Sequence, residues 1–108
     1  MIQVIVIDDH DLVRMGICRL LEDVAGVKVI GEGRSGEEAV LLAKEHQPDV
    51  ILMDVRMPGM GGLEATRKIK RLYPDIAIVV VTACIGDPYP SKLLQAGAAG
   101  FITKEANL

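Results

Sequence analysis

Short runs of apolar residues alternate along the chain with segments in which apolar residues recur every three or four positions. The runs are rich in valine and isoleucine, and they predict strands. The five runs are Ile2–Ile7, Val27–Ile30, Val50–Met53, Ile76–Val81 and Gly100–Ile102. Three of them are apolar throughout rather than alternating with polar residues, which is typical of strands that are covered on both faces.

The segments between the first four strands predict three helices, because their apolar residues share one side at helical spacing. These residues are Val13, Ile17, Leu20, Leu21 and Val24, then Ala39, Leu42 and Ala43, and finally Leu63, Thr66, Ile69 and Leu72.

Polar and turn-forming residues mark the ends of the predicted helices. Asp11 is placed to cap the first helix, and Ser35 followed by Glu38 predicts a capping box for the second. Prolines within residues 88–90 and the glycine Gly97 predict the start and the end of a short fourth helix.

The alternation of strands and helices predicts an α/β fold with a parallel sheet, right-handed crossovers and helices on both faces. The 108 residues suffice for one domain, residues 1–108. The pattern stops after the fifth strand, so a final helix is expected to be missing and the chain to be cut from a longer protein.

Composition excludes several classes of function. The net charge of −3, with both signs mixed along the chain, gives no electrostatic reason for direct binding to nucleic acid. No apolar run is long enough to span a membrane, and Met1 leads directly into a strand without a signal segment, so we expect a cytoplasmic protein. Cys18 and Cys84 lie far apart in apolar segments, which favours reduced core thiols.

Candidate chemistry lies directly after the strands, because ligands bind at the carboxyl ends of strands in open parallel sheets. Asp8 and Asp9 follow the first strand and Asp54 follows the third. Three carboxylates in one crevice repel one another unless a cation is present, and Mg2+ prefers such oxygen ligands. A helix-capping role suits Asp11, but Asp8 and Asp9 come too early for it. The sequence therefore predicts a Mg2+ site.

Three further residues surround this site in the predicted fold. The loop after Asp54 is rich in proline and glycine, and it places the backbone carbonyl of Arg56 as a candidate metal ligand. Lys104, after the last strand, offers an ammonium that would offset the acidic charge and later pair with a phosphate. Thr82 offers a hydroxyl, although threonine is also an ordinary strand residue.

The segments that carry these residues resemble response-regulator receiver domains over the whole chain. They are Val6-Ile7-Asp8-Asp9-His10, the segment from Leu52 to Gly62, Val81-Thr82-Ala83, and Gly100-Phe101-Ile102-Thr103-Lys104. Further segments resemble the NarL/FixJ type of regulator, whose output is a LuxR-type helix-turn-helix domain. They include the segments from Asp8 to Ile17 and from Leu94 to Gly100.

The resemblance implies a flavodoxin-like, CheY-like doubly wound sheet of five strands in the order 2-1-3-4-5. It also implies functional roles. Asp54 is the phosphoacceptor, and Asp54, Asp8, Asp9 and the Arg56 carbonyl hold Mg2+. Thr82 and Lys104 grip the phosphoryl oxygens, and Thr82 and Phe101 form the switch. The implied phosphoryl donor is a sensor histidine kinase or a histidine phosphotransfer protein.

The resemblance further implies a C-terminal DNA-binding domain that this chain does not contain, with a homodimer as one candidate assembly. The chain is then no enzyme beyond its own aspartyl phosphorylation and dephosphorylation. A stand-alone receiver or phosphorelay intermediate is the alternative within the family. Outside it, the alternatives are a flavodoxin-like cofactor binder, whose first loop should not be acidic, and a phosphatase of the haloacid dehalogenase type. That phosphatase requires a second aspartate where this chain has Arg56.

Overall fold

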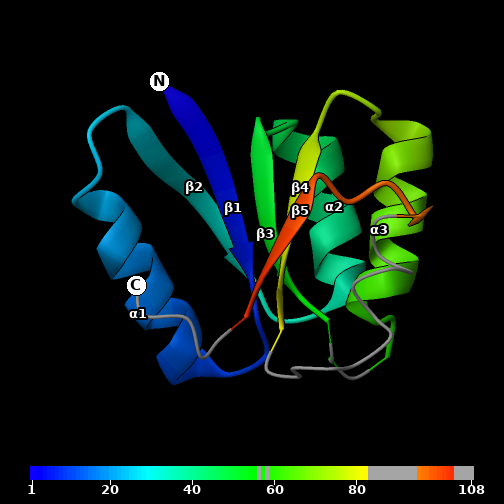
Figure 1. Cartoon of the computed structure of the whole chain (residues 1–108), viewed down its shortest axis with the longest axis horizontal. Coiled ribbons are helices and arrows are strands. Elements are labelled where there is room, and N and C mark those ends of the chain that lie inside the picture. Colours follow the sequence, from blue (N-terminus) through cyan, green and yellow to red (C-terminus); the bar gives the residue numbers. More distant parts are fainter. Residues whose placement is uncertain (56, 58, 83–94, 104–108) are drawn as a thin grey trace.

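The computed structural model of the chain describes residues 1–55, 57, 59–82 and 95–103. It contains a five-stranded parallel sheet in the order β2-β1-β3-β4-β5, with helices packed on its two faces (Figure 1). The elements are β1 (Ile2–Ile7), α1 (Asp11–Glu22), β2 (Val27–Gly33), α2 (Gly36–His46), β3 (Val50–Asp54), α3 (Gly62–Leu72), β4 (Ala77–Thr82) and β5 (Gly100–Thr103). The predicted fold and strand order are confirmed. The end of the chain, where a final helix was expected to be missing, lies outside the described residues. Nearly all of the predicted fourth helix also lies outside them, but Gly97, its predicted end, has the expected positive φ of 110°.

The inner strand β1 contributes side chains to two cores, one on each face of the sheet. Ile5 and Ile7 point into the larger core, which α2 and α3 cover, whereas Val4 and Val6 point into the smaller core under α1. This division follows from the two-residue repeat of strand side chains. Because both faces are covered, all four residues are buried, which explains why the strand is continuously apolar.

Strand β2 is longer than predicted, since it continues from Ile30 to Gly33. Its register with β1 shifts between Val4 and Ile5, so that one residue of β2 bulges from the ladder. At Gly33 a Cβ atom would lie 2.7 Å from Cδ1 of Ile7 and 3.2 Å from Cβ of Glu38, so any other residue would displace these side chains.

The predicted apolar side of α1 is partly wrong. Cys18 is its buried residue, and Ile17 and Leu21 pack beside it. Leu20 is 52% exposed, because two residues along a helix correspond to a rotation of about 200° away from Cys18. Val24 lies beyond the end of the helix and is also exposed.

The predicted start of α2 is confirmed, with one difference. The Ser35 hydroxyl accepts a hydrogen bond of 3.2 Å from the backbone N–H of Glu38, as an N-cap should. The Glu38 carboxylate accepts from the N–H of Arg34, one residue before the cap, instead of from that of Ser35. Both interactions satisfy backbone donors where the helix begins.

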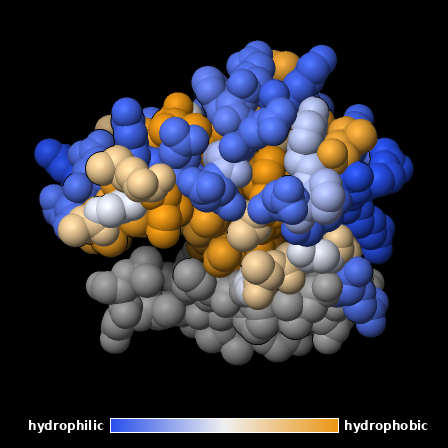
Figure 2. Space-filling model, turned by 90° about the horizontal axis from the view of Figure 1, so that it is seen from above, coloured by the Kyte–Doolittle hydropathy of each residue, from blue (hydrophilic) through white to orange (hydrophobic). Residues whose placement is uncertain are grey.

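The surface seen in Figure 2 mixes hydrophilic and hydrophobic residues. Among the described residues, no helix has both the length and the apolar character that crossing a membrane requires.

Candidate functional site

The register of the sheet brings the predicted acidic residues together. Ile7 of β1 pairs with Met53 of β3, so Asp8 and Asp54, the next residues of the two strands, lie side by side at the carboxyl edge of the sheet. Asp8 is 1% exposed and Asp54 is 4% exposed. Buried carboxylates are costly unless cations or hydrogen-bond donors compensate them, which marks this edge as a site.

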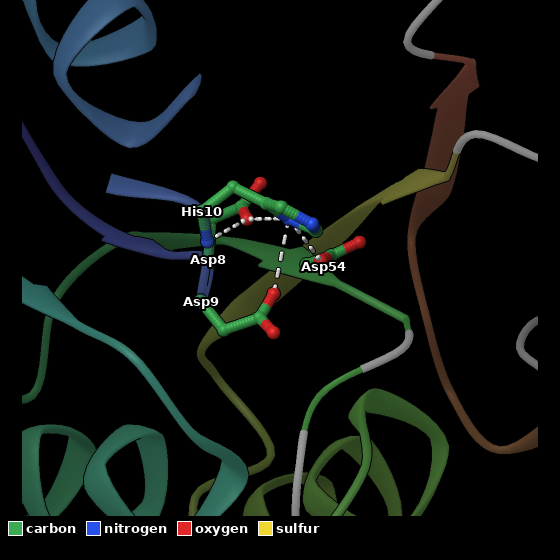
Figure 3. Close-up of side chains that lie close together, drawn as sticks. All are labelled: Asp8, Asp9, His10 and Asp54. Carbon is green, nitrogen blue, oxygen red and sulfur yellow. Dashed lines mark hydrogen bonds and ion pairs between the residues drawn. The ribbon is translucent and has the colours of Figure 1, made fainter. Parts of the chain in front are cut away.

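Asp9 and His10 complete a cluster with these two carboxylates (Figure 3). Ligand-type atoms of the four residues all lie within 4.8 Å of one another. The imidazole Nδ1 of His10 lies 3.0 Å from Oδ1 of Asp8, 3.1 Å from Oδ1 of Asp9 and 3.9 Å from Oδ2 of Asp54. The imidazole therefore faces all three carboxylates.

Backbone hydrogen bonds hold Asp8 at the end of β1. Its N–H donates to the carbonyl of Gly33 at 3.0 Å, which ties the loop to the extended end of β2. Its Oδ1 accepts a 2.8 Å hydrogen bond from the N–H of His10, the local turn that aspartate favours. These contacts leave Asp8 little freedom to move away from Asp54.

Arg14 binds the same loop from α1. Its guanidinium donates to the backbone carbonyl of Asp8 at 2.8 Å, to Asp11 at 2.8 Å and to Glu32 at 3.1 Å. The arginine thus joins the acidic loop to the first turn of α1 and to β2.

The predicted capping role of Asp11 is wrong. The N-cap of α1 is His10, and Asp11 is the first helical residue. The carboxylate of Asp11 instead accepts from Arg14 and lies 3.3 Å from Nε of Arg34. The hydrogen bond from Arg14, with the charge of Arg34, holds the pKa of Asp11 below its ordinary value.

The loop after Asp54 is fixed by close backbone packing. A Cβ atom on Gly62 would lie 2.3 Å from the carbonyl oxygen of Asp54, so glycine is required where α3 begins. Gly59 has a φ of 71°, and the N–H of Met60 donates to Glu37 of α2 at 2.9 Å. The glycine-rich composition of this loop therefore has a structural reason.

The other predicted site residues are placed only in part. The backbones of Thr82 and Phe101 lie on β4 and β5, where Thr82 pairs with Thr103 and Phe101 pairs with Val80. Thr82 ends β4, one residue past the Val81 that pairs with Asp54. The side chains of Thr82 and Phe101, together with all of Arg56 and Lys104, lie outside the described residues.

The donor set fits a divalent cation. Three carboxylates supply the hard oxygen ligands that Mg2+ prefers, and the imidazole adds a nitrogen donor that also suits transition metals. Two contacts here were missed in the sequence, those of His10 and of Arg14. His10 follows two aspartates directly, which was an available signal, whereas the reach of Arg14 to β2 depends on the fold.

Comparison with known proteins identifies the family. Residues 4–108 match the response regulator receiver domain. The chain belongs to this family. The receiver is 61% identical over 108 residues to the response regulator GacA of Pseudomonas protegens, which covers 100% of this chain and 51% of GacA. It is 53% identical over 106 residues to the response regulator UvrY of Escherichia coli, covering 98% of this chain and 49% of UvrY.

A solved structure gives the same result. The receiver superposes with a TM-score of 0.93 on a two-component response regulator of the LuxR family from Aurantimonas, at 37% identity, covering 97% of this chain and 75% of that one. The chain spans about half the length of GacA and UvrY. The family match decides against the flavodoxin-like cofactor binder and the phosphatase. A receiver is not a typical enzyme.

Proposed function

We propose that this receiver accepts a phosphoryl group on Asp54 from the phosphohistidine of a sensor kinase or of a histidine phosphotransfer protein. The observation that carries the proposal is the burial of Asp54 at the end of β3, beside Asp8 and Asp9. A carboxylate held at a strand end, next to a candidate cation site, is suited to nucleophilic attack on phosphorus.

The transfer balances without any other reactant. A carboxylate oxygen of Asp54 attacks phosphorus and forms a P–O bond, while the P–N bond to the donor histidine breaks, its electron pair stays on the imidazole nitrogen, and that nitrogen takes up a proton from solvent water. Mg2+ held by Asp8, Asp9, Asp54 and the Arg56 carbonyl would, when bound, neutralise charge on the phosphoryl oxygens.

Three residues have roles that rest on family resemblance. Thr82 and Lys104 would bind the phosphoryl oxygens, and Phe101 would change orientation with Thr82 to alter the surface around β5. Strand β5 is the last strand of the described sheet, so such a change would act at this edge of the domain.

A substitution at the acceptor tests the proposal. Asp54→Asn removes the nucleophile, and Asp75→Asn is the matched control because Asp75 is exposed in the turn between α3 and β4. With Mg2+ and a small acyl phosphate donor, the parent protein and the control should take up label, and Asp54→Asn should take up none. Label that survives Asp54→Asn would place the acceptor elsewhere.

For the whole protein we propose a transcription regulator whose remaining half carries a LuxR-type helix-turn-helix domain. The support is that relatives named as response regulators are about twice as long as this chain. Phosphorylation of Asp54 would then control DNA binding or dimerisation. A full-length sequence without a helix-turn-helix segment would contradict this and favour the stand-alone alternative.

A further inference from the structure

His10 occupies the N-cap position of α1 but does not cap the helix. Its backbone is extended, with φ of −91° and ψ of 104°, and within the described structure its side chain makes no hydrogen bond to the helix N–H groups. Aspartate, asparagine or serine would stabilise the helix start better, by about 1 kcal/mol. The histidine therefore gives up local stability, and its imidazole turns to the carboxylates instead (Figure 3).

The spacing of that imidazole matches a shared coordination shell. In octahedral coordination with bonds of about 2.1 Å, adjacent ligand atoms lie about 3.0 Å apart and opposite ones about 4.2 Å apart. Nδ1 of His10 is hydrogen-bonded to Oδ1 of Asp8 at 3.0 Å and lies 3.1 Å from Oδ1 of Asp9. Once Nδ1 gives up its proton to solvent, both distances suit adjacent ligands of one metal ion. The distance of 3.9 Å from Nδ1 to Oδ2 of Asp54 falls between the two limits.

We propose that His10 is a nitrogen ligand of this site, which therefore binds transition-metal divalent cations such as Co2+ or Zn2+ more tightly than its carboxylates alone would. Mg2+ gains little from an imidazole, whereas Co2+ and Zn2+ favour it. The inference rests on the proposed function, because both use the same carboxylates. It goes further in assigning a ligand and a metal preference.

The backbone geometry supports a ligand that is already in place. The N–H of His10 donates to Oδ1 of Asp8 at 2.8 Å, so the residue is held directly over the carboxylate that it would share a metal with. The side chain of His10 is 61% exposed, which leaves the ring accessible from solvent. Exposure also means that truncating this side chain should not disturb the core.

The two histidines of the chain allow a matched experiment. His10→Ala removes the proposed ligand, and His46→Ala, in the last turn of α2, is the control. Co2+ binding is followed by its visible absorption, and Mg2+ binding by competition against Co2+. We expect His10→Ala to weaken Co2+ binding about tenfold or more, to change Mg2+ binding less than about threefold, and to shift the Co2+ spectrum. His46→Ala should match the parent.

The outcomes separate this inference from the proposed function. If Asp54 is labelled normally but His10→Ala binds Co2+ as tightly as the parent does, the inference is wrong and the proposed function stands. If His10→Ala binds both metals more tightly, His10 is a competitor of the metal and the inference is overturned. If the parent binds neither metal and Asp54 takes up no label, both fail.

Discussion

Arg14 donates a 2.8 Å hydrogen bond to the backbone carbonyl of Asp8, and its side chain is only 12% exposed. The same guanidinium also binds carboxylates on α1 and β2. A guanidinium is suited to this task, because its three nitrogens each donate to a different acceptor, whereas lysine has a single nitrogen. The acidic loop is therefore held by a residue that contacts the backbone of Asp8 rather than its carboxylate.

Replacing Arg14 with lysine should loosen that loop. We expect Arg14→Lys to lower the free energy of unfolding by about 1–2 kcal/mol, since hydrogen bonds to charged groups are lost. We also expect weaker Mg2+ binding with unchanged stoichiometry. Urea unfolding and metal titration measure the two effects.

The control is Arg19→Lys, because Arg19 is exposed in the last turn of the same helix. It should change neither stability nor metal binding. If Arg14→Lys binds Mg2+ as the parent does, Arg14 serves stability alone.

A methyl group at position 62 should disrupt β3, the strand that carries Asp54. Its Cβ would lie 2.3 Å from the carbonyl oxygen of Asp54 and 2.9 Å from Cα of Val55, and both are backbone atoms that cannot rotate away. We expect Gly62→Ala to cost about 2 kcal/mol or more of unfolding free energy and to reduce labelling of Asp54.

Gly16 is the matched control for Gly62. It lies inside α1, and a Cβ there meets no atom within 4 Å. Gly16→Ala should stabilise the protein by about 0.5–1 kcal/mol, because alanine is the better helix former. Equal effects of the two substitutions in urea unfolding would contradict the close packing of α3 on β3.

Thr66 carries a buried hydroxyl in the α3 core. The residue is fully buried, and within the described structure its Oγ1 has no hydrogen-bond partner. An unsatisfied buried hydroxyl costs about 1–3 kcal/mol. Thr66→Val keeps the shape and removes that cost, so we expect the free energy of unfolding to rise by about 1 kcal/mol. Thr66→Ser keeps the hydroxyl and loses a methyl group, so it should lower the free energy of unfolding. If Thr66→Val also lowers it, the hydroxyl has a hydrogen-bond partner in solution.

The architecture and the acidic cluster could be predicted because they follow from simple patterns. Valine and isoleucine runs separated by helical segments predict a parallel sheet, and parallel strands end at one edge. The proximity of Asp8 and Asp54 therefore followed from their positions after two strands. Predicting Asp54 as the phosphoacceptor required only that inference and the family resemblance.

The remaining details depend on contacts between distant segments. Strand β2 continues through Gly33 because glycine permits close packing on Ile7, which strand propensity does not reveal. The contact of Arg14 with Glu32 joins residues 18 positions apart. The orientation of the His10 side chain toward the carboxylates depends on its backbone angles at the start of α1. Asp11 was predicted as the cap because aspartate is a more common capping residue than histidine.

Cys18 provides a pH-dependent test of the smaller core. Burial, and then the nearby Glu32 carboxylate, raise the pKa of the Cys18 thiol from its ordinary value of 9.0 to about 11. Above pH 9 the unfolded thiol loses its proton while the native thiol keeps it, so the native state binds more protons. This contribution to stability is complete below pH 9 and is lost as the pH rises toward 11.

Lysine and tyrosine side chains titrate in the same pH range, so the test compares two proteins. The free energy of unfolding of the parent should fall more steeply between pH 9 and pH 11 than that of Cys18→Ala, both in a Cys84→Ser background. At neutral pH the native Cys18 should also react slowly with iodoacetamide, because the thiolate is the reactive form. If the free energies of unfolding of the two proteins fall equally with pH, or if Cys18 is alkylated rapidly at neutral pH, the thiol is not held protonated in the smaller core.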